Sequence, residues 1–89
     1  MTRYHFNVHN GFGFLRDEEG RALPGLAAAR EEGLKGARSI IADEVLQGRA
    51  DLRGRLEIVD DDDRILMTIG FAEAVEVLLP AAGGGETTH

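Results

Sequence analysis

With 89 residues, 43% of them hydrophobic and 29% charged, the chain is long enough for one globular domain and too short for two. It contains no cysteine, which excludes disulfides, a thiolate metal site and a cysteine nucleophile, and favours a cytoplasmic location. The net charge of -6 argues against nucleic-acid binding, which needs a basic surface, and no stretch approaches the roughly 20 apolar residues that span a membrane.

The first predicted element is a β-hairpin over residues 3–17. Apolar and polar residues alternate from Tyr4 to His9, which is typical of a strand with one buried face. Asn10-Gly11 is typical of a type I′ turn, and a two-residue loop there would set Val8 opposite Gly13. One face of the hairpin then carries Tyr4, Phe6, Val8 and Leu15, and the other carries His5, Asn7, His9, Phe12, Phe14 and Arg16.

A long amphipathic helix is predicted over residues 25–47. Pro24 and Gly25 suit its start, and Gly48 fits a left-handed cap at its end. Gly33 and Gly36 together cost about 2 kcal/mol of helix propensity, so we expect close approach of the helix to a neighbour, with the aromatic side chains of the first hairpin as the candidates. The apolar residues follow three-and-four spacing along one stripe: Leu26, Ala29, Gly33, Leu34, Ala37, Ile40, Ile41 and Val45.

A second hairpin is predicted over residues 55–71, with its turn in the aspartate run 60–63. We expect its core face to carry Leu56, Ile58, Ile65, Met67 and Ile69. Residues 71–78 fit either a helical turn or an edge segment, packed against the core in both cases. The glycine-rich residues 80–89 are predicted to be a disordered tail, which leaves a single domain over residues 1–79.

These elements predict an α+β domain with the order β-β-α-β-β. Two hairpins form one antiparallel sheet, and the long helix packs across one face of it as a second layer.

Candidate chemistry is sparse, and we expect no catalytic site, no metal and no cofactor. His5 and His9 share a strand face but lie about 13 Å apart along it, too far for one ion that needs ligands at about 2.1 Å. The aspartate run lacks the glycine and glutamate positions of a calcium loop, and Ser39, the only serine, has no glycine elbow. A metal or ligand site using His5 and His9 stays open as an alternative, with a carboxylate added from a neighbouring strand or a second subunit.

One helix can cover only one face of the sheet, so the opposite face of the first hairpin is the candidate functional surface. Aromatic, histidine and arginine side chains together are typical of an interface centre. We therefore expect a binding or assembly domain, not an enzyme, whose partner is a second copy or another protein. Two alternatives stay open: cover of this face by residues 71–78, and a ligand or nucleic-acid site with stacked bases. The residues concerned are His5, Asn7, His9, Phe12, Phe14 and Arg16.

A set of short motifs keeps a distinctive order and spacing between residues 3 and 77. The motifs are Arg3-Tyr4-His5-Phe6-Asn7-Val8, Gly11, Asp17-Glu18-Glu19-Gly20, Leu23-Pro24, Ala28-Ala29 with Ala37, Gly54-Arg55, Val59-Asp60, Ile65-Leu66, and Phe71 with Ala74-Val75. In these the chain resembles a family of short bacterial proteins known only as domain of unknown function sixty-eight ninety-four. The resemblance implies the domain limits and a bacterial cytoplasmic setting, and it implies no activity, ligand or catalytic residue.

A weaker resemblance concerns the strand, the glycine turn, the acidic linker 17–20, Leu23-Pro24-Gly25-Leu26 and the alanine-rich helix. These are similar to the N-terminal domain of HicB-type antitoxins, which bind and inhibit a small RNA-cleaving toxin. Such domains usually place a third strand before the helix, for which Ala22-Leu23 is available here. This resemblance implies partner binding through the exposed face of the sheet.

Overall fold

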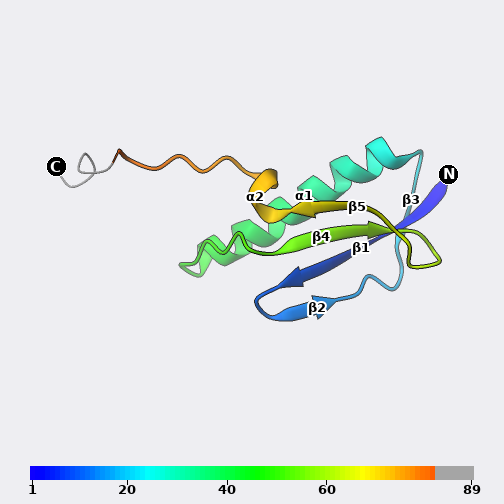
Figure 1. Ribbon diagram of the computed structural model, residues 1–89, viewed down its shortest axis with the longest axis horizontal. Coiled ribbons are helices and arrows are strands. Elements are labelled where there is room, and N and C mark those ends of the chain that lie inside the picture. The colour runs from blue at the N-terminus through cyan, green and yellow to red at the C-terminus, as the bar shows by residue number, and fades with distance from the viewer. Residues whose placement is uncertain (82–89) are drawn as a thin grey trace.

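A computed structural model describes residues 1–81 and has the predicted α+β architecture: an antiparallel sheet of order β2-β1-β4-β5 with the long helix α1 packed on one face (Figure 1). The predicted tail, residues 80–89, lies almost wholly outside the described residues. The strands are β1 (Thr2–Asn10), β2 (Gly13–Leu15), β3 (Arg21–Leu23), β4 (Arg55–Val59) and β5 (Ile65–Gly70), and the helices are α1 (Leu26–Leu46) and α2 (Phe71–Ala74).

Two short elements lie outside the predicted order β-β-α-β-β, although a helical turn was one of the two alternatives predicted for residues 71–78. The first is β3, which pairs with the start of β1 through Thr2 and Leu23, on the same edge of β1 that β2 occupies further along. The second is α2, a single turn that buries Phe71 and Ala74 and packs against α1. Elements this short contain no full period of hydrophobicity, so the sequence pattern alone could not resolve them.

The first hairpin forms with a turn that differs from the predicted one. His9 lies opposite Phe14 and Asn10 opposite Gly13, so the loop residues are Gly11 and Phe12 and not Asn10 and Gly11. The Asn10 side chain accepts a hydrogen bond from the Phe12 N–H at 2.8 Å, which stabilises this turn, and the positive φ of 119° falls on Gly13. The register moves by two residues, and because side chains alternate with a period of two, each strand residue keeps its predicted face.

The core lies between α1 and one face of the sheet, to which β1, β4 and β5 contribute buried residues. The stripe of Ala29, Gly33 and Ala37 is buried against the sheet. A Cβ atom added to Gly33 would lie 3.0 Å from Cδ1 of Ile69 and 3.4 Å from Cδ1 of Ile58. The prediction that aromatic residues of the first hairpin approach these glycines is therefore wrong, since aliphatic side chains of β4 and β5 take that place.

The ends of α1 follow the predicted signals. The helix begins at Leu26, directly after Gly25. At its other end Gly48 has a φ of 91°, its N–H donates to the Val45 carbonyl at 2.9 Å, and the Arg49 N–H donates to the Glu44 carbonyl at 3.0 Å. This pair of hydrogen bonds is a Schellman motif, which confirms the predicted glycine cap and fixes the direction of the chain at Arg49.

The second hairpin turns in the aspartate run as predicted, but a β-bulge changes its register. Ile58 pairs with Met67 and Val59 pairs with Ile65, so Leu66 is an extra residue on β5. The bulge turns Ile65 to the face away from α1, where it is 58% exposed. The prediction that Ile65 belongs to the core is therefore wrong, whereas Met67 and Ile69 do pack against it.

Candidate functional site

The face of the sheet that points away from α1 is called the outer face here. The strand register places its residues in three rows: Phe14, His9 and Arg55; Asn7, Glu57 and Thr68; and His5, Val59 and Ile65. Residues 71–74 form α2 and pack with α1, on the other side of the sheet. In the described residues this segment therefore does not cover the outer face, contrary to one of the predicted alternatives.

The turn of the first hairpin carries the most exposed aromatic residues. Phe12 is 79% exposed and Phe14 is 53% exposed, and together with Leu15 they form what we call the hairpin tip. The Phe14 ring lies 4.6 Å from the His9 ring at a tilt of 39°. The Arg49 guanidinium lies 5.9 Å from the centre of the Phe12 ring, within the range of a cation–π interaction. The tip therefore combines aromatic area with a nearby positive charge.

Behind the tip, the charges of the outer face are paired. His9 Nε2 lies 3.1 Å from Glu57 Oε1, and Arg55 Nε donates to Glu57 Oε2 at 3.2 Å. Burial raises the pKa of Glu57, but the hydrogen bonds from His9 and Arg55 outweigh it and hold that pKa below its ordinary value. Glu57 is therefore an ionised carboxylate with both oxygens engaged.

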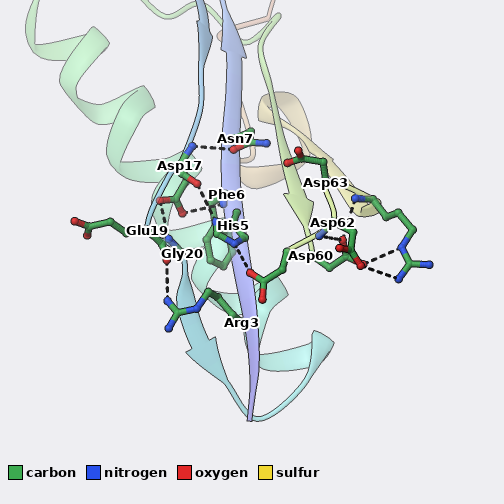
Figure 2. A network of polar contacts seen from close by, with 12 residues as sticks. Arg3, His5, Phe6, Asn7, Asp17, Glu19, Gly20, Asp60, Asp62 and Asp63 are labelled. Carbon is green, nitrogen blue, oxygen red and sulfur yellow. Dashed lines mark hydrogen bonds and ion pairs between the residues drawn. The ribbon is translucent and has the colours of Figure 1, made fainter.

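His5 lies at the centre of a separate polar network at the other end of the sheet (Figure 2). Its Nδ1 lies 2.9 Å from the Asp17 carbonyl oxygen and its Nε2 lies 2.8 Å from Asp61 Oδ1. Both partners can only accept, so the geometry assigns a proton to each ring nitrogen and a positive charge to the ring. The hydrogen bond to Asp61 raises the pKa of His5 by more than burial lowers it. His5 thus joins the connection between β2 and β3 to the turn between β4 and β5.

Asp17 fills the gap that separates β2 from β3 along β1. Its carboxylate accepts hydrogen bonds from the Phe6 N–H at 3.0 Å and the Gly20 N–H at 3.1 Å (Figure 2). Its own N–H donates to the buried Asn7 side chain at 2.8 Å. The Phe6 N–H of β1 is therefore satisfied where no strand pairs with it, and the Asn7 side chain helps to hold Asp17 in place.

The six residues of the predicted interface fall into two groups. Both ring nitrogens of His5 are engaged in the polar network, and Asn7 is buried and accepts a hydrogen bond from the Asp17 N–H. Arg16 pairs with Asp63 at 2.8 Å, which raises its pKa, but remains near half exposed. The accessible group consists of His9, Phe12, Phe14 and Arg16.

The loop after α1 adds residues beside the tip that are not among the six residues of the predicted interface. A cavity of about 280 Å³ beside the tip is lined by His9, Asp51, Arg53 and Arg55, among others. Asp51 accepts from Arg53 at 2.9 Å and from Arg49 at 3.3 Å, and the hydrogen bonds from Arg53 hold the pKa of Asp51 well below its usual range. These arginines are partly neutralised, which weakens the case for phosphate binding.

Two further structural tests concern metals and membranes. Within residues 1–81, no three side chains among His, Asp and Glu come together in a group that could hold a metal ion. His5 and His9 instead contact different carboxylates, Asp61 and Glu57. Neither described helix has the length and apolar character needed to cross a membrane.

Comparison with known proteins gives one match. A family model described as Domain of unknown function (DUF6894) matches residues 3–72, which is most of the chain and covers the described strands except for Thr2 at the start of β1. Neither a curated protein nor a solved structure matches, so the similarity to HicB-type antitoxins gains no support.

Proposed function

This chain belongs to the DUF6894 family of domains of unknown function, and on that premise we propose that it is a non-catalytic protein-binding module that uses its hairpin tip and the adjoining outer face. The observation that carries the proposal is the exposure of Phe12 and Phe14, at 79% and 53%, beside Arg49. The absence of cysteine supports a cytoplasmic setting.

The tip has the features of a binding hot spot. Such spots are enriched in aromatic residues and arginine, and complete burial of a phenylalanine side chain contributes roughly 1.5–3 kcal/mol. The tip is also held in place before any partner arrives, by the Asn10 side chain at the turn and the His9 ring beneath Phe14. A rigid contact surface loses little conformational entropy on binding, which favours affinity.

The state of the ionisable groups supports binding over catalysis. A general acid or base needs an atom free to exchange a proton with a substrate. Both His5 nitrogens are engaged, and both Glu57 oxygens accept hydrogen bonds. These groups stabilise the sheet and leave the aromatic side chains as the accessible chemistry.

The double substitution Phe12→Ala and Phe14→Asp tests the proposal. Light scattering would report the native mass, and affinity capture followed by titration with each purified partner would report binding. We expect at least about a tenfold loss of affinity, or about 1.4 kcal/mol, because two hot-spot side chains are removed. Leu46→Asp is the control, since it adds the same charge at an apolar side chain that is 85% exposed at the end of α1. Unchanged mass and unchanged binding of every partner in the double variant would show that the tip is not an interface.

One observation favours a small RNA-cleaving toxin as a second candidate partner. β3 lies directly before α1, where the similarity to HicB-type antitoxins expects a third strand. The chain should then inhibit RNA cleavage by a toxin of that kind, and unchanged cleavage in its presence would dismiss this candidate. A metal- or ligand-binding role for His5 and His9 is tested separately by zinc and nickel titration. Stoichiometric binding that is lost in His5→Ala would replace the binding-module proposal at that site.

A further inference from the structure

The two edges of the sheet differ in how they are protected. The edge beyond β1 is divided into β2 and β3, three residues each, with Asp17 binding the exposed backbone between them. The other edge is β5, a strand of six residues that contains neither a charged side chain nor a proline. Short strands, charges and prolines are the usual means by which edge strands avoid pairing with another chain. β5 has none of these three, and a bulge at Leu66, which is a further means of protection, is the one it does have.

Hydrogen bonding at β5 is also one-sided in the described residues. Within the described part of the chain β5 pairs with β4 alone. Outside that ladder, the contact made by its backbone is the Gly70 N–H donating to Glu73 Oε2 at 3.1 Å. The outward N–H and C=O groups between Ile65 and Ile69 are therefore free to pair with a further strand.

We propose that β5 pairs antiparallel with β5 of a second copy of this chain, so that one sheet continues through two molecules about a twofold axis. Each copy carries a net charge of -6, which opposes association except where the contact is neutral or complementary. The β5 strand itself is uncharged. A twofold axis sets the start of one strand beside the end of the other, and Arg64 at that start is already paired with Asp60 of its own chain at 3.1 Å, so the neutral strand is what makes the contact.

The segment after α2 supplies apolar area at the same edge. Standard interfaces bury roughly 800 Å² per partner, which calls for apolar side chains in addition to a backbone ladder. Val77, Leu78 and Leu79 are 55%, 81% and 80% exposed, without a place in the core of their own chain. Figure 1 shows that this segment leaves the molecule on the β5 side of the sheet, opposite β2. It is therefore placed to pack on the second copy beside the paired strands.

Analytical ultracentrifugation of the full chain over a wide concentration range tests this inference. The wild type should dimerise, and the variant Ile65→Lys with Thr68→Lys should dimerise at least about tenfold more weakly, because it places like charges across the paired edges. Both side chains are exposed on the outer face, so the substitution spares the core. Ala27→Lys with Ser39→Lys adds the same charge on the exposed side of α1 and should leave the dimer unchanged.

A second variant, Leu78→Asp with Leu79→Asp, keeps the test decisive if the lysine variant fails to fold. It changes only exposed side chains outside the core and should also weaken the dimer. A monomeric wild type at all concentrations would overturn the inference and leave β5 for the chain's own C-terminal segment or for another protein. A dimer that both variants leave intact would overturn it as well. If Phe12→Ala with Phe14→Asp dissociates the dimer and the lysine variant does not, the hairpin tip is the dimer contact, so this inference fails while the proposed function stands.

Discussion

Separate replacement of the two glycines of α1 tests how closely the helix lies on the sheet. A Cβ atom at Gly36 would lie 3.7 Å from Cδ1 of Leu56, an ordinary contact, whereas a Cβ atom at Gly33 would lie 3.0 Å from Cδ1 of Ile69. Alanine is favoured over glycine inside a helix by about 1 kcal/mol. Gly36→Ala should therefore raise the free energy of unfolding by about that amount.

Gly33→Ala gains the same stabilisation from helix propensity, but crowding of the new Cβ atom against Ile69 offsets it. Overpacking of a core typically costs about 1–3 kcal/mol, so the net change should lie between about 0 and 2 kcal/mol of destabilisation. Ile69→Val removes the methyl group that obstructs the new Cβ atom, at a cost of about 0.5–1.5 kcal/mol on its own. In that background Gly33→Ala should no longer destabilise, which makes the two substitutions coupled by about 1 kcal/mol or more.

Urea unfolding followed by circular dichroism would measure all four differences. For a domain of this size, 1 kcal/mol corresponds to a shift of about 4–8 °C in Tm, so thermal unfolding can check the sign. The reasoning is refuted if Gly33→Ala stabilises the wild type as much as Gly36→Ala does. Absence of coupling between Gly33 and Ile69 would equally show that α1 and the sheet are further apart than they are in the structure.

Two further predictions concern the polar network. Folding raises the pKa of His5 above 6.5, so its contribution to stability is complete below that pH and is lost as the pH rises through the raised pKa. The difference in unfolding free energy between wild type and His5→Gln should therefore shrink as the pH rises above about 6.5 in urea titrations, and a constant difference would contradict the assigned charge. Asp17→Ala leaves the N–H groups of Phe6 and Gly20 without their acceptor and should cost about 1–3 kcal/mol in the same assay. The neighbouring exposed Glu18→Ala should change stability by less than about 0.5 kcal/mol, and equal effects of the two substitutions would refute the role given to Asp17.

Local sequence signals predicted the helix and the faces of the strands. The cap at Gly48 depends on a few consecutive residues, and its geometry is as predicted. The face of each strand residue in the first hairpin survived an error of two residues in the turn, because strand side chains alternate with a period of two. An extra residue breaks this rule, as Leu66 does when its bulge moves Ile65 out of the core.

Contacts between distant segments could not be read from the pattern. Nothing near Phe12 in the sequence indicates that Arg49 lies over its ring, and β3 has too few residues to signal a strand. Gly33 did signal a close approach, but periodicity says nothing about which side chain approaches. The sheet order, which sets β4 beside β1, decides that it is Ile69.

The sequence by itself determined the secondary structure of the long elements and the division of the sheet into a covered and an outer face, because hydrogen bonding within a helix and alternation within a strand are local. Only the tertiary structure decided which outer-face residues are available for function. His5 reaches Asp61, 56 positions away, and Asn7 reaches the backbone of Asp17, so both serve the fold. Phe12 and Phe14 stay 79% and 53% exposed, and the proposed protein-binding surface rests on them.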